Sequence, residues 1–193
     1  ESSVSHDEID MLIPTYLGKN MKALINELKE KEQDYELYPT TREMLNMVYQ
    51  HMFSTRLHGT QNILDIGCGT CNFMRYLSEY IATYHEKGCF HYNYYVMEKS
   101  QILINQLPSE AIGTDFNECM LIDKVADIVF CNPPYSEFVN WTKRILFETS
   151  ARHIYLVIPE RWKHNDEIRS ALEVVNGKAE VLGSFDFLDA ERA

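Results

Sequence analysis

The fold of this chain is decided by the stretch Asp127-Ile128-Val129-Phe130-Cys131-Asn132-Pro133-Pro134-Tyr135. Its first five residues form a short apolar run, which is typical of a buried strand in a parallel sheet. The Asn-Pro-Pro-Tyr that follows is a rigid turn, because proline fixes its own backbone angle and lacks an N–H donor. A second stretch, 62–69, likewise runs from an apolar strand into a turn, Gly67-Cys68-Gly69. Two such strands predict a ligand site where the strands of a parallel sheet end.

Strands and helices alternate along the rest of the chain. Apolar runs predict strands at about 61–66, 94–98, 110–114, 126–131, 153–158 and 179–187. Helices are expected at about 10–31, 41–56, 72–86, 100–107, 136–149 and 165–174. This alternation predicts an α/β fold with a mostly parallel central sheet and helices on both faces.

Two local signals mark the first helices. An amphipathic helix is predicted by the i, i+3, i+4, i+7 spacing of Met21, Leu24, Ile25 and Leu28. Further on, Thr40 and Glu43 form a capping box, which predicts a helix from about residue 41. The preceding Tyr38-Pro39 is expected to be extended, because a residue before proline avoids helical angles. The segment around Tyr38 fits either a plain helix start or a contact with a cofactor.

Composition limits the kinds of partner. The 193 residues suffice for one domain with a core, and their net charge is −11. An acidic surface repels phosphates, so nucleic-acid binding would need a local basic patch, a protein partner or a segment missing here. The five cysteines, an odd number in a chain with no recognisable export signal, indicate reduced thiols and a cytoplasmic location. No apolar run approaches the length of a membrane span, so we expect no membrane partner.

The glycine turn predicts a bound nucleoside. A strand, a glycine turn and a helix place backbone N–H groups near a polar ligand, and Gly67 and Gly69 allow close approach. A dinucleotide fingerprint would need a third glycine at 72, where the chain has Asn72. Glu98 ends the next strand and could accept hydrogen bonds from both ribose hydroxyls, although a strand-terminal acid can also simply face water.

Asp115 and Phe116 follow the next expected strand. An acid and an aromatic ring at a strand end could bind the amino group of adenine and cover its ring. Asp115 could equally cap the next turn. Cys68-x-x-Cys71 has the spacing of a metal or redox motif, but no second cysteine pair follows at zinc spacing. We therefore assign both cysteines to the glycine turn and predict no metal site.

The Asn-Pro-Pro-Tyr turn suits an amino group attached to a π system. Such a nitrogen is a poor nucleophile, because its lone pair is delocalised. The side-chain oxygen of Asn132 and the carbonyl of Pro133 could each accept one N–H and draw the nitrogen toward a tetrahedral geometry. Tyr135 offers a flat surface for the attached π system. The alternative is a turn with no chemical role. A cytosine-C5 enzyme would need a Pro-Cys nucleophile, but Cys131 precedes the asparagine.

Residues 60–160 resemble the class I S-adenosylmethionine-dependent methyltransferases, specifically the amino-methylating branch with an Asn-Pro-Pro-Tyr motif. That branch includes adenine-N6 DNA methyltransferases, rRNA base methyltransferases and release-factor glutamine methyltransferases. The resemblance implies a Rossmann-like fold, S-adenosylmethionine as cofactor, an N-terminal helical extension over 1–34 and a catalytic domain over 35–193. A narrower similarity, to small uncharacterised methyltransferase-like proteins of phages and mobile elements, lies in 38–41, 157–163 and 182–188.

The resemblance also implies roles for single residues. The target nitrogen would be held by Asn132, Pro133 and Tyr135. The cofactor would be bound by Tyr38, Pro39, Thr40, Asp65, Gly67, Gly69, Glu98, Asp115, Phe116 and Asn132. Further substrate contacts are expected from the polar loop Arg161, Trp162, Lys163 and His164, where charged residues are more often simply solvated.

Two departures from the family pattern bear on the substrate. Cys71 replaces the usual third glycine, and the chain stops just after the strand expected at 179–187. We therefore expect a truncated chain without the final antiparallel strand and without a domain for target recognition. Adenine-N6 methylation, of DNA ahead of RNA, is the favoured function. The alternatives are methylation of an rRNA base or of a protein glutamine, and a non-catalytic methyltransferase-like subunit that needs a protein partner.

Overall fold

The central sheet has five strands in the order β3-β2-β1-β4-β5, and every pairing between them is parallel. The computed structural model describes residues 21–55, 57–86, 90–107 and 111–185. The strands are β1 Gln61–Ile66, β2 Tyr92–Met97, β3 Ala111–Gly113, β4 Ile128–Cys131 and β5 His153–Leu156. This is an α/β Rossmann-like fold, as predicted. The strand order reverses between β1 and β4, where ligands bind in sheets of this kind.

The register of the strands aligns three residues that the sequence singled out. Ile66 of β1 pairs with Met97 of β2 on one side and with Cys131 of β4 on the other. The next residue of each strand is therefore Gly67, Glu98 or Asn132, and all three leave the sheet at the same edge. The two stretches that predicted the fold thus meet at the point where the strand order reverses.

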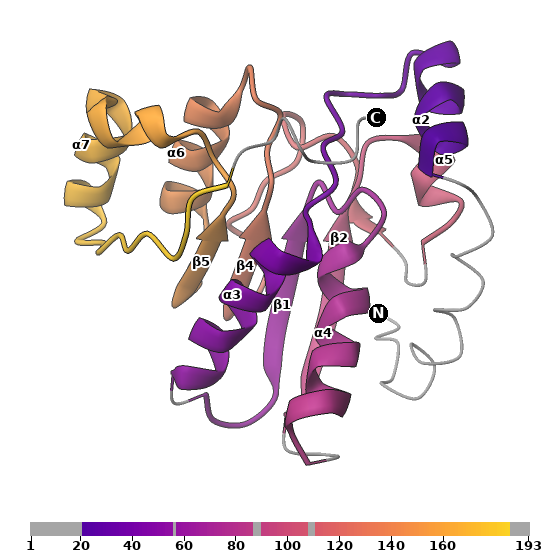
Figure 1. Cartoon of the computed structure of the whole chain (residues 1–193). Coiled ribbons are helices and arrows are strands. Elements are labelled where there is room, and N and C mark those ends of the chain that lie inside the picture. Colours follow the sequence, from indigo (N-terminus) through magenta and orange to yellow (C-terminus); the bar gives the residue numbers. More distant parts are fainter. Residues whose placement is uncertain (1–20, 56, 87–89, 108–110, 186–193) are drawn as a thin grey trace.

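The helices lie on both faces of the sheet. They are α2 Met21–Glu30, α3 Arg42–Ser54, α4 Asn72–Tyr84, α5 Gln101–Ile104, α6 Phe138–Glu148 and α7 Asp166–Val174, with a 3-10 turn η2 at Glu160–His164. Figure 1 shows α3 and α4 crossing in front of the sheet. α6 packs on the opposite face, and α7 packs beside α6. None of the helices in these described ranges has the length and apolar character that a membrane span needs.

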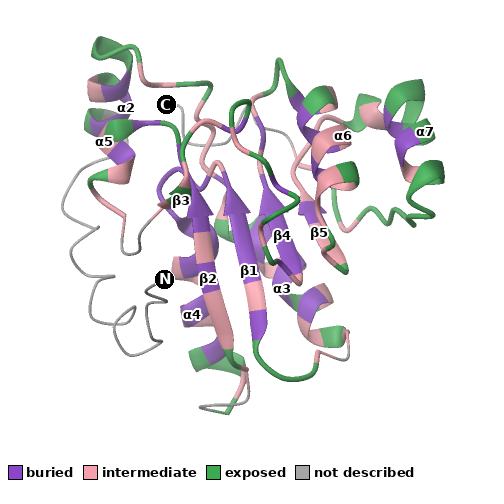
Figure 2. Ribbon diagram, turned by 180° about the vertical axis from the view of Figure 1, so that it is seen from behind, coloured by how far each residue is buried: buried purple, intermediate pink, exposed green. Residues whose placement is uncertain are grey.

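Successive side chains along the strands point to opposite faces of the sheet and pack into two separate cores. Ile63 of β1 and Phe130 of β4 pack under α3 and α4, whereas their neighbours Leu64 and Val129 pack under α6. Every residue of β4 is buried, as a parallel strand covered on both faces requires. Figure 2 shows β1 and β4 as the buried centre of the sheet and the helices with exposed outer sides.

The segment between α2 and α3, which we call the strap (residues 33–40), crosses over the C-terminal ends of the strands (Figure 1). Leu24 and Leu28 of α2 form a small core with Leu103 of α5, and Leu37 of the strap packs against it. The helix predicted at 10–31 is confirmed over Met21–Glu30, and its earlier part lies outside the described residues.

Two expectations were wrong. The helix cap is Thr41, whose side chain accepts from the N–H of Met44 at 3.4 Å, because both oxygens of Thr40 bind other residues. The strand expected at 179–187 does not form over its described part, 179–185. Those residues lie against α3 and its core instead: Glu180 approaches His51 at 3.7 Å, and Leu182 packs against the core under α3 and α4.

Candidate functional site

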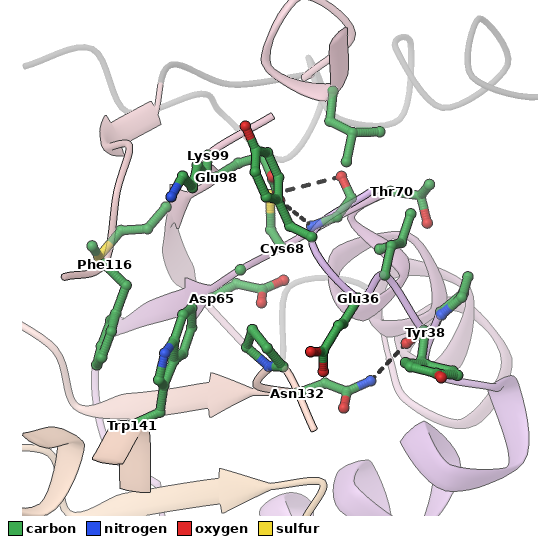
Figure 3. A pocket seen from close by; sticks show the side chains of 18 of the residues that line it. Glu36, Tyr38, Asp65, Cys68, Thr70, Glu98, Lys99, Phe116, Asn132 and Trp141 are labelled. Carbon is green, nitrogen blue, oxygen red and sulfur yellow. Dashed lines mark hydrogen bonds between the residues drawn. The ribbon is translucent and has the colours of Figure 1, made fainter. Parts of the chain in front are cut away.

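A cavity of about 320 Å³ lies at the C-terminal ends of β1, β2 and β4. Sites for small molecules have volumes of roughly 300–1,000 Å³. Figure 3 shows side chains converging on this cavity from the strap, the sheet and α6. All the residues expected to bind the cofactor line it: Tyr38, Pro39, Thr40, Asp65, Gly67, Gly69, Glu98, Asp115, Phe116 and Asn132. The structure thus brings together residues that are far apart in the sequence.

Of the three residues expected to hold the target nitrogen, only one lines the cavity. Asn132 lines the cavity, whereas Pro133 is buried outside the lining and Pro134 faces the cavity instead. The Asn-Pro-Pro-Tyr turn therefore contributes Asn132 and Pro134 to the cavity lining. Tyr135 lies outside the cavity and is 52% exposed.

Arg161 is the residue of the 161–164 loop that reaches Tyr135. Its guanidinium donates to the Tyr135 hydroxyl at 2.7 Å and lies 4.4 Å from the centre of the ring. Trp162, Lys163 and His164 lie outside the cavity lining, and Lys163 approaches Glu160 at 3.7 Å. Of the expected substrate loop, only Arg161 therefore has a contact with the Asn-Pro-Pro-Tyr turn among the interactions of the described residues.

The glycine turn is held by β2. The N–H groups of Gly67 and Cys68 both donate to the Met97 carbonyl, at 2.8 and 3.1 Å. Gly67 and Gly69 have φ angles of +69° and +55°, which suit glycine. Cys71, where the family resemblance expects glycine, also has a left-handed φ of +53° and is buried. The backbone therefore keeps the glycine conformation despite the substitution, at a cost of about 1–2 kcal/mol.

The Cys68 thiol of this turn is not activated. Burial raises the pKa of the Cys68 thiol, which favours its protonated form. The described ranges contain no group of three or more His, Cys, Asp or Glu side chains arranged to hold a metal ion.

Glu98 is fixed by two backbone donors. Its buried carboxylate accepts from the N–H of Gly69 at 2.8 Å and from the N–H of Ser100 at 2.7 Å. Burial raises the pKa of this carboxyl, while the backbone donors oppose that rise. Each carboxylate oxygen has a second lone pair, so Glu98 can still accept from a ligand hydroxyl in the cavity.

Asp65 is a buried acid without a cationic partner among its hydrogen bonds. It is 2% exposed, and the hydroxyl of Tyr94 donates to its carboxylate. Burial raises the pKa of Asp65 to about 7, and nearby Glu98 adds to the rise. A cation bound next to this carboxylate would relieve the cost of burying its charge.

Acidic side chains dominate the cavity wall. The carboxylates that line it belong to Asp34, Glu36, Asp65, Glu98, Asp115 and Glu137. Lys99 is the one lysine or arginine among the described lining residues, and it pairs with Asp115 at 2.8 Å. This ion pair lowers the pKa of Asp115. The cavity therefore favours a ligand with positive charge over one with a pyrophosphate.

Trp141 is a wall residue that the sequence did not single out. Its ring stacks on Phe116 with centroids 4.0 Å apart, and its indole N–H donates to Glu137 at 2.9 Å. Arg144 lies over the Phe116 ring at 4.4 Å. Phe116 is therefore enclosed by protein, and the aromatic surface of this wall includes Trp141 (Figure 3).

Asp115 caps the next turn, which is one of its two predicted roles. It does so by accepting from the N–H of Asn117 at 3.0 Å, and it also lines the cavity. Its pairing with Lys99 could not be read from the sequence, because Lys99 stands at the end of a different strand.

The Asn132 carboxamide is held in one orientation. Its nitrogen donates to the carbonyl of Tyr38 at 2.7 Å and to the hydroxyl of Thr40 at 3.1 Å (Figure 3 shows the first of these partners). A backbone carbonyl only accepts, so the NH₂ group must point toward the strap. No described residue donates to the carboxamide oxygen, which is left to accept from a ligand.

The strap is fastened at several points. Gln33 accepts from the hydroxyl of Ser100 and the N–H of Ile102, both at 3.1 Å. Glu36 accepts from the N–H of Ser136 at 3.0 Å, and Asn72 donates to the Thr40 carbonyl at 2.9 Å. Tyr35 and Glu36 have positive φ angles of 42° and 56°, a conformation that non-glycine residues rarely adopt.

Comparisons with known proteins add little to this picture. No protein-family model matches the sequence, and no curated protein matches it. Among solved structures, the chain is similar to the plantazolicin methyltransferase BpumL in complex with a pentazolic desmethylPZN analog and SAH. The similarity has a TM-score of 0.44 and 18% sequence identity, and covers 87% of this chain and 70% of that chain. That level of similarity assigns no function, so the function must come from the site. The fold and site define an α/β protein with an acidic ligand cavity at the reversal point of a parallel sheet.

Proposed function

We propose that this protein is an S-adenosylmethionine-dependent N-methyltransferase. The observation that supports this most is the Asn132 carboxamide, whose oxygen is free to accept while its nitrogen is bound by the strap. That carboxamide shares one cavity with the glycine turn and with Glu98. A fixed acceptor for an amino group beside a nucleoside-sized cavity suits transfer of a methyl group to nitrogen.

The cavity charges suit this cofactor. S-adenosylmethionine carries a sulfonium and an ammonium group against a single carboxylate, so it is a cation overall. Asp65 and the glycine turn would hold the methionine part, Glu98 the ribose, and Asp115 with Trp141 the adenine. The acidic wall would stabilise the cationic cofactor electrostatically. A dinucleotide, with its pyrophosphate, would face the same carboxylates unfavourably.

The residues of the chain would act by orientation. The bound cofactor would supply an electrophilic methyl group: a bond from the acceptor nitrogen to the methyl carbon would form as the carbon–sulfur bond breaks, and the sulfur would leave as a neutral thioether. Asn132 would accept one N–H of the acceptor and so direct the nitrogen lone pair along the line of attack. Its oxygen would also stabilise the positive charge that develops on the nitrogen. The surplus proton then leaves the methylated nitrogen for water.

Adenine N6 in DNA is the first proposed acceptor. Support comes from the Tyr38-Pro39-Thr40 segment together with Asn-Pro-Pro-Tyr, and the structure joins these through the contacts of Asn132. Arg161 beside Tyr135 is the proposed contact with a phosphate or base, and the remaining phosphate contacts would come from a partner or a further segment.

A protein glutamine is the second candidate acceptor. The net charge of −11 and the carboxylates of Glu36 and Glu137 in the cavity wall favour an acceptor without phosphates. A glutamine side chain presents the same planar NH₂ group without bringing negative charge.

The proposal is tested first by calorimetry with S-adenosylmethionine and then by transfer of a tritiated methyl group. The acceptors are duplex DNA, rRNA and a release factor, each assayed with the same protein preparation. Cofactor binding with methyl transfer to DNA supports adenine N6 as the acceptor. Cofactor binding with methyl transfer to the release factor supports a protein glutamine. Binding without transfer to any acceptor favours a non-catalytic subunit, and absence of binding contradicts the proposal.

Gly69→Ala is expected to weaken cofactor binding about tenfold, because the added methyl group forces the end of the Leu37 side chain, which lines the cavity, to move. An added Cβ would lie 2.8 Å from Leu37 Cδ1, and φ is +55°. Gly59→Ala is a matched control: Gly59 also has a positive φ, +72°, but its Cβ would meet nothing within 4 Å. Both variants should lose about 1–2 kcal/mol of stability, and only Gly69→Ala should lose affinity in calorimetry. Equal affinities of the two variants would contradict the role of Leu37.

A further inference from the structure

Thr40 is a buried polar residue whose two oxygens bind two different asparagines. It is 7% exposed. Its hydroxyl accepts from Asn132 at 3.1 Å, and its backbone carbonyl accepts from Asn72 at 2.9 Å. The cap of α3 is provided by Thr41, so the Thr40 hydroxyl is not needed to start the helix. Its position is therefore better explained by what it does to the two asparagines.

The hydroxyl of Thr40 completes the restraint on Asn132. A primary amide has two N–H donors, and the carbonyl of Tyr38 takes one of them at 2.7 Å. One hydrogen bond leaves the carboxamide free to tilt about its terminal torsion, which is broad in asparagine. The second bond, to Thr40, fixes the plane of the carboxamide and hence the direction of its oxygen.

Asn72 connects this restraint to the glycine turn. Asn72 is buried at the start of α4, donates to the Thr40 carbonyl and accepts from the Thr70 hydroxyl at 3.0 Å. The neighbouring Gly69 is held by Glu98 at 2.8 Å. A chain of hydrogen-bonded residues thus runs from Glu98, through the glycine turn, Asn72 and Thr40, to Asn132. The asparagine that breaks the dinucleotide fingerprint at position 72 is the middle of this chain.

We infer that Thr40 is a positioning residue, which orients the Asn132 carboxamide and ties that orientation to a closed strap and an ordered glycine turn. This inference rests on the proposed N-methyltransferase function for its effect on rate, but not for its effect on the carboxamide. The strap then has two roles: Leu37 covers the glycine turn, and Thr40 orients the Asn132 carboxamide toward the methyl acceptor.

The test compares Thr40→Val with Thr40→Ser in the full chain. Valine keeps the shape of threonine and removes the hydroxyl, whereas serine restores it. The first readout is the pair of side-chain NH₂ signals of Asn132 in a ¹⁵N–¹H spectrum, assigned by their loss in Asn132→Ala. One of the two proton shifts should move upfield in Thr40→Val and stay near its original position in Thr40→Ser. Thermal unfolding checks that both variants are folded.

The second readout is catalysis. Methyl transfer should fall about tenfold or more in Thr40→Val and recover to within about twofold in Thr40→Ser. The affinity for S-adenosylmethionine is measured in the same variants, and a loss of affinity as large as the loss of rate would assign the Thr40 hydroxyl to the cofactor instead. Unchanged Asn132 signals in folded Thr40→Val would overturn the inference, and so would an unchanged transfer rate. A wild-type protein that binds no cofactor would refute the proposed function alone, since the NH₂ signals still report on Thr40.

Discussion

Asp65→Asn is expected to stabilise the protein above pH 7 and, in the same variant, to weaken cofactor binding. The pKa of Asp65 is raised from 3.8 to about 7 by burial. The folded protein therefore keeps a proton that the unfolded chain releases between these pH values. The free energy of unfolding contributed by this group is highest below pH 4 and falls as the pH rises to 7. Asparagine removes that loss, so the variant should gain about 2–4 kcal/mol at pH 8 and little at pH 4.

Urea unfolding of the wild type and the variant at pH 4 and pH 8 measures this effect. Asp123→Asn, at an exposed side chain, is the control and should change little at either pH. Calorimetry should show a loss of S-adenosylmethionine affinity of at least about tenfold in Asp65→Asn. In the wild type, affinity should rise between pH 6 and pH 8, because a cationic ligand favours the ionised acid. A variant that is less stable than the wild type at pH 8 would show that Asp65 is structurally required.

Asn132→Ala is expected to reduce methyl transfer by at least about 100-fold, a loss much larger than the accompanying loss of cofactor affinity. The variant removes the oxygen that would accept from the target nitrogen. It also removes both donors to the strap, at Tyr38 and Thr40. Asn132→Asp is a sharper variant, since it keeps an acceptor oxygen but cannot donate, and its charge faces the Tyr38 carbonyl.

Single-turnover transfer and calorimetry measure the two quantities separately. Asn140→Ala, at an exposed position of α6, is the control and should transfer at the wild-type rate. Wild-type transfer by Asn132→Ala would remove Asn132 from the reaction. A loss of cofactor affinity as large as the loss of rate would assign Asn132 to the cofactor alone.

The apolar runs of the sequence were enough to predict the strands of the sheet. They could not predict which side chains pair with one another across the site. The strands expected at 61–66 and 126–131 form as β1 Gln61–Ile66 and β4 Ile128–Cys131, and all the residues expected to bind the cofactor line one cavity. Burial on both faces leaves a strong pattern in a parallel strand, and glycine turns leave a strong pattern after it. These signals are local, so they survive in a single sequence.

The missed features depend on residues far apart in the chain. The capping box at Thr40 was wrong because Asn72 and Asn132, 32 and 92 residues away, bind its two oxygens. Trp141 and Lys99 join the cavity through Phe116 and Asp115, which lie on another loop. The strand expected at 179–187 has an alternating pattern, yet over 179–185 the chain packs beside α3.

The acidic wall of the cavity also bears on how the proposed reaction ends. Methyl donation turns a positively charged sulfur into a neutral thioether, so the spent cofactor carries one positive charge fewer than the fresh one. A wall with many carboxylates and a single lysine attracts the first more strongly than the second. The acidic wall would thus bind S-adenosylmethionine more tightly than its demethylated product. Product inhibition would then be weak, and fresh cofactor would readily replace the product.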